Sequence, residues 1–194
     1  MPWRNGAGVT REIARAPAQG ENFAWRLSLA TLQTSGPFSS YSGYHRGVAL
    51  VDGRGFRLSV AGTAARDLTV RGDYALFPGA AESSCEILDG PCTDLSLMVR
   101  EPGKIDAVTR MGITAEHLTS VPVDRIQVIF VLAGAIECRA AGPSDQGPAS
   151  RPRQYTLNVN DTLLMHGRGD TWSMRPAAGG ITESLLITFT PTDL

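Results

Sequence analysis

The stretch from Trp25 to Val60 constrains the fold more than any other part of the chain. It opens with WRLSLATL, in which large apolar residues alternate with polar or small ones at a period of two, and this pattern predicts a half-buried strand. It closes with GVALVDGRGFRLSV, two apolar runs that flank Asp52-Gly53-Arg54-Gly55. The Asp-Gly pair predicts a type I′ hairpin, because both central residues of that turn need positive φ. The intervening loop, QTSGPFSSYSGYHR, is too polar for a core and too aromatic for a linker.

The rest of the chain reads as further short strands separated by Gly and Pro turns. No stretch has a convincing 3.6-residue period of helical length, so the sequence predicts an all-β protein. Residues 108–118 are compatible with two short strands. The other expected strands lie near 9–15, 23–32, 45–51, 56–61, 67–71, 74–77, 84–88, 93–100, 125–132, 135–140, 154–158, 162–166, 171–175 and 181–190.

An internal repeat indicates a duplicated β-barrel. The segments 50–58, 71–77 and 94–101 match 131–139, 158–165 and 183–190, in the same order. Three matches in register favour duplication over chance. We therefore expect two halves, 1–103 and 104–194, packed as one compact unit. Residues 141–153, AGPSDQGPASRPR, are predicted to form an exposed, mobile loop in the second half.

Composition excludes several classes of partner. The 194 residues carry 18 Lys and Arg against 19 Asp and Glu, a net charge of -1, and no basic run suggests nucleic-acid binding. There is no apolar span of membrane-crossing length and no signal-peptide core. Cys85, Cys92 and Cys138 follow no metal spacing and are expected to be buried and reduced. These features predict a cytoplasmic monomer or homodimer with no membrane partner.

The order of strands and turns resembles the cupin pattern, whose metal-binding version has two His and a Glu before its first hairpin and a third His later. Here Arg46 stands at the Glu position and Ser83 at the last His position. In the second half, Gln127 and Thr171 take those places. A metal site of this kind needs imidazoles, and the three His of the chain, His45, His117 and His166, have no suitable spacing. We expect no metal and no other cofactor.

Five segments of the first half resemble the HutD/Ves family of bicupin-like proteins. In order, they are WRNGAGVTREIA, FAWRLSLA, GPFSSYSGYHR, ALVDGRGFRL and GPCTDLSLM. The resemblance implies two RmlC-type double-stranded β-barrels and a link to histidine utilisation, with binding of a metabolite such as formylglutamate as a proposed role. Ala7 and Ser96 stand where the family usually has Gly and Asn, which implies an altered pocket. The family also usually has a short upstream segment, so a first strand is expected to be missing or supplied differently.

Arg46 is the leading candidate for a binding residue, because a guanidinium offers a planar fork to a carboxylate. The alternative is a salt bridge to Asp94 or Glu12. Arg26 and Ser28 share one face of their strand, which points either into a barrel mouth or to solvent. The loop aromatics either wall a pocket or cluster at the surface, and the Gly-rich first turn is a possible lid. The expected ligand-binding set is Trp3, Asn5, Arg26, Ser28, Phe38, Tyr41, Arg46, Asp94 and Ser96.

The residues favour a metal-free protein that binds a small anionic metabolite, with a carboxylate as the expected class, over two other classes of protein. A metal-independent isomerase or lyase would need a tuned acid or base, for which His45 beside Arg46 is the candidate. A structural partner protein would need an exposed apolar patch. No catalytic residue is assigned.

Shortening the loop at 141–153 to a few residues tests its expected exposure. A Pro, Gly and Ser-rich segment buries little apolar area, so the change in unfolding free energy should stay below about 1 kcal/mol. Urea denaturation measures this, and loss of folding would show that the segment packs.

Overall fold

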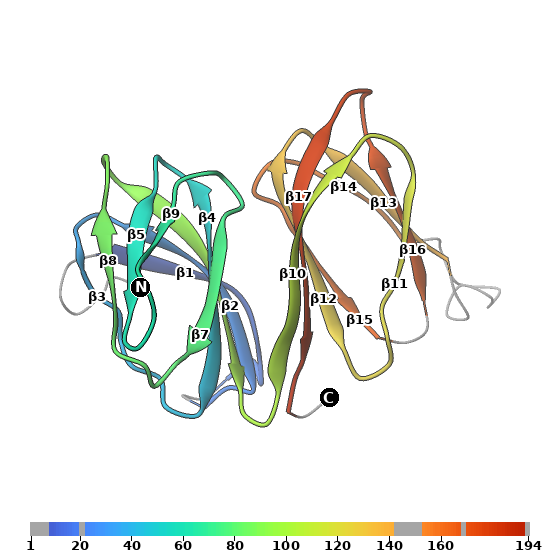
Figure 1. Cartoon of the computed structure of the whole chain (residues 1–194). Helices are drawn as coiled ribbons and strands as arrows, with labels where there is room; N and C mark the ends of the chain where they lie inside the picture. The colour runs from blue at the N-terminus through green and yellow to red at the C-terminus, as the bar shows by residue number, and fades with distance from the viewer. Residues whose placement is uncertain (1–7, 20–21, 142–152, 168–169, 193–194) are drawn as a thin grey trace. The chain divides into compact units, whose positions relative to one another are not determined.

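The computed structural model describes residues 8–19, 22–141, 153–167 and 170–192. All seventeen regular elements of these residues are strands, which confirms the all-β prediction (Figure 1). The chain forms two compact units that divide after Ile105, with residues 191–192 belonging to the first. The predicted loop at 141–153 lies outside the described residues except at its two ends.

The first unit consists of two antiparallel sheets. One has the order β1-β2-β9-β4-β7 and the other β3-β8-β5-β6. The bounds are β1 (Gly8–Ala16), β2 (Trp25–Leu32), β3 (Gly36–Pro37), β4 (Tyr44–Asp52), β5 (Phe56–Val60), β6 (Arg66–Leu68), β7 (Tyr74–Pro78), β8 (Ser83–Ile87) and β9 (Cys92–Arg100). Both sheets contribute to one hydrophobic cluster, with Leu50 and Phe77 from the first and Phe56 and Cys85 from the second. The sheets therefore enclose a shared interior.

The second unit repeats this plan (Figure 1). Its sheets have the orders β10-β17-β12-β15 and β11-β16-β13-β14, which match β2-β9-β4-β7 and β3-β8-β5-β6. The bounds are β10 (Lys104–Ile113), β11 (His117–Ser120), β12 (Ile126–Ala133), β13 (Ile136–Ala141), β14 (Gln154–Leu157), β15 (Thr162–His166), β16 (Thr171–Pro176) and β17 (Thr182–Thr190). The matching topology confirms the predicted duplication. Its core includes Val131, Ile136, Met165 and Trp172.

Strand register corrects part of the sequence repeat. Leu50 and Val131 are equivalent, as the repeat predicts. The N–H of Leu50 donates to the backbone carbonyl of Asp73 at 2.9 Å, and the N–H of Val131 donates to the backbone carbonyl of Asp161 at 3.1 Å. Leu50 lies opposite Asp94 on β9, whereas Val131 lies opposite Ser184 on β17. The sequence match of Asp94 with Glu183 is therefore wrong by one residue. In β-structure such a shift moves a side chain to the other face.

The predicted hairpin at residues 52–55 is wrong. β4 pairs with β7 and β9, and β5 pairs with β6 and β8, so the turn carries the chain from one sheet to the other. Positive φ occurs at Gly53 (89°) and Gly55 (108°), not at Asp52. The glycines are needed because the turn passes close to other backbone: a Cβ at Gly53 would lie 2.7 Å from Cys92 Cα.

β2 also differs from the prediction of a half-buried strand. Leu27 and Ser28 point to opposite faces and are 0% and 2% exposed. Both faces of β2 are therefore buried. The face with Leu27 packs in an apolar environment, and the face with Ser28 points into a more polar interior. This interior holds the candidate site.

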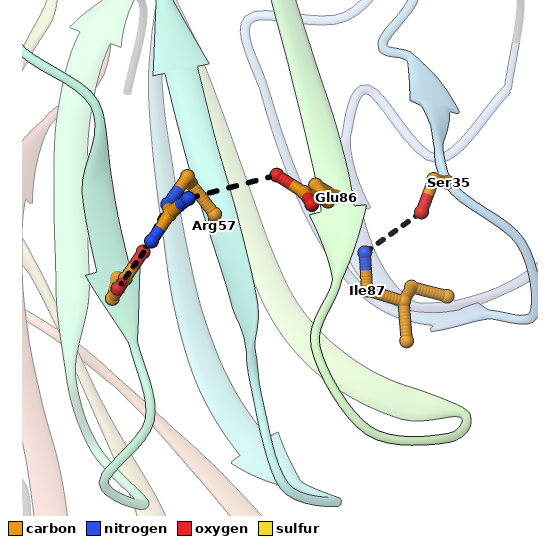
Figure 2. Close-up of polar contacts among 5 residues, drawn as sticks. Ser35, Arg57, Glu86 and Ile87 are labelled. Atoms are coloured by element: carbon orange, nitrogen blue, oxygen red, sulfur yellow. Dashed lines mark hydrogen bonds and ion pairs between the residues drawn. The ribbon is translucent and has the colours of Figure 1, made fainter.

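Polar contacts connect neighbouring strands of the second sheet of unit 1 on its exposed side (Figure 2). Arg57 on β5 forms a two-pronged ion pair with Asp67 on β6, at 2.7 Å and 3.0 Å, and lies 3.8 Å from Glu86 on β8. The hydrogen bond from Arg57 lowers the pKa of Asp67. Ser35 Oγ accepts from the N–H of Ile87 at 2.9 Å. These exposed charges lie opposite one another across strands, and they are already partnered.

Replacing Gly53 with Ala should destabilise the protein by about 2–4 kcal/mol, because a Cβ there meets backbone and the residue has positive φ. Gly62→Ala is the matched control: Gly62 also has positive φ, at 80°, but nothing lies within 4 Å of its Cβ position. We expect the control to lose about 1 kcal/mol. Thermal and urea unfolding measure both, and equal losses would contradict the close approach as the cause.

Candidate functional site

Strand register places the two candidate arginines on either side of one methionine. Arg26 on β2 and Arg46 on β4 both lie opposite Met98 on the intervening strand β9. Directly opposed residues share a face of the sheet, so all three point into the interior of the first unit. Phe77 on β7 extends the row, since it lies opposite Arg46.

Arg46 is held in a mainly aromatic environment. Arg46 is 4% exposed, and its Nη1 donates to the backbone carbonyl of Ser39 at 3.0 Å. Its Cζ lies 5.2 Å from the ring centroid of Phe38, 5.8 Å from that of Tyr41 and 5.1 Å from that of Phe77. Aromatic faces attract a cation but accept few of its hydrogen bonds. Among the described residues, nothing accepts a hydrogen bond from Arg46 Nε.

Arg26 shares the ring of Tyr41 with Arg46. Its Cζ lies 5.4 Å from that ring centroid and 4.8 Å from the ring centroid of Phe23. Nη2 donates to Tyr41 Oη at 3.3 Å and to Met98 Sδ at 3.5 Å. Its Nε also lacks an acceptor in the described part of the chain. Two guanidinium groups therefore lie around one tyrosine.

Asp94 is the carboxyl group that acts electrostatically on Arg46. It is 1% exposed, and its Oδ1 has no hydrogen-bond partner among the described residues. Burial raises the pKa of Asp94 to about 7, and attraction to Arg46 opposes the rise. Burial likewise lowers the pKa of Arg46, which Asp94 and Tyr41 partly offset. The interior thus favours the neutral form of Asp94 up to near neutral pH.

The predicted salt bridges of Arg46 are absent from the described residues. Asp94 influences Arg46 through space without a contact as short as an ion pair. Glu12 instead lies 3.4 Å from Arg15 Nε on its own strand. The observed hydrogen bond of Arg46 goes to the Ser39 carbonyl, which no side-chain pattern in the sequence identifies.

Most of the predicted binding residues gather at this interior face. Ser28 and Ser96 lie opposite each other on β2 and β9, and both are buried. With Arg26, Phe38, Tyr41, Arg46 and Asp94 they form one group, and their role in binding stays a prediction. Trp3 and Asn5 lie outside the described residues. The sequence reading did not include Phe77, whose place follows only from the pairing of β4 with β7.

His45 does not join this group. It is adjacent to Arg46 on β4, and neighbouring strand residues point to opposite faces. Its side chain is 42% exposed, and Nε2 lies 4.0 Å from Glu101 Oε1. An acid or base role for His45 at Arg46 therefore has no geometric support.

The positions that bind metal in related barrels hold other side chains. Gln127 lies opposite Met165, as Arg46 lies opposite Phe77, and it accepts from Thr119 Oγ1 at 3.2 Å. Trp172, not Thr171, occupies the place of Ser83: it faces Ala140 on β13 as Ser83 faces Val60 on β5. The described residues include no group of three or more His, Cys, Asp or Glu arranged to hold a metal ion.

Comparison with known proteins gives the family. The sequence model of the HutD family matches residues 1–183. The chain belongs to the HutD family. It is 41% identical over 99 residues to an uncharacterised 21.2 kDa protein from the region 3′ of hutC in Pseudomonas putida, covering 50% of this chain and about half, 52%, of that relative. It is 33% identical over 159 residues to protein Ves of Escherichia fergusonii, covering 81% of each chain.

Solved structures agree with this assignment. A conserved protein of unknown function from Pseudomonas aeruginosa has a TM-score of 0.81 at 27% identity, covering 98% of this chain and 93% of that one. HutD from Pseudomonas fluorescens has a TM-score of 0.73 at 28% identity, covering 98% and 92%. A cupin 2 barrel protein from Leptotrichia buccalis, with a TM-score of 0.60 at 13% identity and coverage of 93% and 88%, shares the fold. The predicted cupin-like fold is thereby confirmed. The described residues include no helix that could span a membrane.

Asp94→Asn should change how stability depends on pH. The pKa of Asp94 rises from its ordinary value of 3.8 to about 7 on folding, so the folded state holds its proton longer and loses stability as pH rises through this window. The variant lacks this term. Relative to the parent, its unfolding free energy should increase by about 1–3 kcal/mol between about pH 4 and pH 8.

Urea titrations across this range measure the difference. Asp67→Asn is the control, because Asp67 is exposed and its pKa is lowered by Arg57. Its difference from the parent should move in the opposite sense, with stability lost relative to the parent as pH rises above the acid range. Parallel pH profiles for Asp94→Asn and the parent would show that folding does not raise the pKa of Asp94.

Proposed function

We propose that the first unit binds a small carboxylate metabolite between Arg26 and Arg46, and that the protein acts in histidine utilisation as a metabolite-binding regulator. The observation that carries the proposal is the surplus of positive charge on either side of Met98, where Arg46 is buried and Arg26 is partly buried. Among the described residues neither guanidinium has an ion pair, and Asp94 is the one carboxyl that offsets Arg46. Buried charges are usually paired, so an anionic ligand would complete this interior.

The donor geometry favours a carboxylate. Each arginine has a buried Nε–H without an acceptor in the described part of the chain. A guanidinium offers two parallel N–H donors, which match the two oxygens of a carboxylate. Two such groups suit a ligand with two anionic or carbonyl ends, and formylglutamate is a metabolite of this class. The structure of HutD from Pseudomonas fluorescens was determined in a formate condition, and formate is the smallest carboxylate.

The family context supports the regulatory part of the proposal. The Pseudomonas putida relative is named for its place beside hutC. A protein that binds a metabolite without consuming it can limit the flux or report its level. The proposal places this role in the cytoplasm, with no metal, no nucleic acid and no membrane partner.

An enzyme remains the second candidate, and Asp94 is the observation that favours it. A buried carboxyl with a pKa of about 7 has the properties of a general acid or base near neutral pH. A metal-independent isomerase or lyase would use Asp94, not His45, at this site. Incubation of formylglutamate with the protein, followed by proton NMR of the small molecule, separates the two: turnover lost in Asp94→Asn favours the enzyme.

Substitution of Arg46 tests the binding proposal. Arg46→Lys keeps the charge but loses the planar fork, so affinity for formylglutamate should fall about tenfold or more, and Arg46→Ala should lose more, as charge-assisted hydrogen bonds contribute about 1.5–3 kcal/mol. Isothermal titration calorimetry measures affinity, with the melting temperature recorded for each variant. Arg57→Lys is the matched control, since Arg57 is exposed and paired with Asp67; it should bind as the parent does.

The opposite pattern would assign Arg46 a structural role. If Arg46→Ala unfolds while Arg46→Lys binds formylglutamate with parental affinity, the guanidinium is a brace for Ser39 and the aromatic rings, and the proposed site is wrong.

A further inference from the structure

The second unit contains a cavity. It has a volume of about 240 Å³. Three strands supply most of its lining: β14 and β15, each at the edge of its sheet, and β16, which neighbours β13. Its lining residues are Arg153, Tyr155, Leu163, Leu164, Met165, His166 and Trp172. A volume of this size suits a small organic molecule, below the usual range for drug-sized ligands.

Trp172 is the most informative of these residues. It occupies the position that Ser83 has in the first unit, on the inner face of the second sheet. It is 3% exposed, and its indole Nε1–H has no acceptor among the described residues. A buried indole N–H is ordinarily satisfied, so a ligand that reaches it from the cavity would supply the missing acceptor.

Tyr155 and Arg153 both lie beside the Trp172 ring. The ring of Tyr155 lies 6.2 Å from that of Trp172 with an interplanar angle of 24°, and Tyr155 is 43% exposed. Arg153 Cζ lies 5.3 Å from the Trp172 ring centroid. Arg153 is fixed by an ion pair from Nη2 to the buried carboxylate of Asp170. This ion pair holds the planar guanidinium, a group whose geometry matches a carboxylate, beside the Trp172 ring.

Apart from His166, the remaining wall is apolar. Leu163 and Met165 line the cavity from β15, opposite Ile129 and Gln127 on β12. A ligand for this site therefore needs an apolar, preferably flat body to lie against the rings and the thioether. It also needs an acceptor group for the indole N–H and the guanidinium.

We propose that the second unit binds a small planar organic acid, an aromatic or conjugated carboxylate, in the cavity between β14, β15 and β16. The flat part of the ligand lies against Tyr155 and Met165, and its carboxylate accepts from Trp172 Nε1 and Arg153. This site rests on different residues from the site at Arg46, and it does not depend on the function proposed there.

Benzoate is a suitable probe, and the indole signals of the three tryptophans report on it by ¹H–¹⁵N correlation NMR. The Trp172 signal is identified by its loss in Trp172→Phe. Benzoate should shift this signal with a saturating dependence on concentration. Cyclohexanecarboxylate has the same charge without the flat ring, and benzamide has the ring without the charge. Each should bind at least about fivefold more weakly than benzoate, since each lacks one of the two contacts.

Variants locate the binding. Tyr155→Ala, at an exposed ring, and Arg153→Lys, which keeps a cation beside Asp170, should each weaken benzoate binding about fivefold or more. Arg175→Lys is the matched control, because Arg175 lies on β16 and its guanidinium pairs with Glu137; its affinity should equal that of the parent. Arg46→Lys should also leave the Trp172 titration unchanged.

Four results would overturn the proposal. The first is a Trp172 signal that does not shift, or shifts without saturation, at tens of millimolar benzoate. The second is binding of cyclohexanecarboxylate as tight as that of benzoate, and the third is parental benzoate affinity in folded Tyr155→Ala. The fourth is loss of the Trp172 shift in Arg46→Lys. The last would place benzoate at the first-unit site. The two sites therefore fail independently: formylglutamate affinity reports on Arg46, and the Trp172 signal reports on the second unit.

Discussion

The first unit depends on how it accommodates two arginine cations on its inner face, of which Arg46 is buried and Arg26 is partly buried. A guanidinium that leaves water needs charge compensation and hydrogen-bond acceptors. Arg26 and Arg46 obtain part of this from aromatic faces, a tyrosine hydroxyl, a thioether and one backbone carbonyl. These partners are weaker than carboxylates. The loop between β2 and β4 provides two of these aromatic rings. Tyr41 lies against Arg26, and Phe38 lies against Arg46.

The two units show how one scaffold carries different interiors. Equivalent positions hold Arg46 and Gln127 on one strand pair, and Ser83 and Trp172 on another. In the first unit the large charged side chain of Arg46 is combined with the small side chain of Ser83. In the second unit the amide is satisfied by Thr119, and the large aromatic residue lines a cavity. Duplication preserved strand order and register, while the side chains at these positions determine what each interior can bind.

The sequence predicted the strands and the repeat well, because period two and glycine turns are local signals. It failed where the outcome depended on which strands pair. The turn at Gly53 has the composition of a hairpin, but its flanking strands enter different sheets. The alternation in β2 predicted one buried face, but Ser28 is as buried as its apolar neighbours because that face lines an interior. Arg46 was identified through its position, whereas Phe77 and the Ser39 carbonyl became visible only in three dimensions.

Arg46 stands where the metal-binding cupin pattern, which the sequence resembles, has a glutamate. In related barrels that position contributes a carboxylate to a cation; here it contributes a cation, and the nearby carboxyl of Asp94 has a pKa raised to about 7. An anion that enters beside Arg46 would repel ionised Asp94 and favour its proton, so binding of a carboxylate and uptake of a proton by Asp94 are linked. Burial leaves the Nε of each arginine without an acceptor in the described part of the chain, and it weakens the compensation that Asp94 gives Arg46 because it favours the protonated carboxyl. Burial thus limits how far Asp94 can compensate the charge of Arg46, and this shortfall is what supports the proposed binding of an anionic ligand.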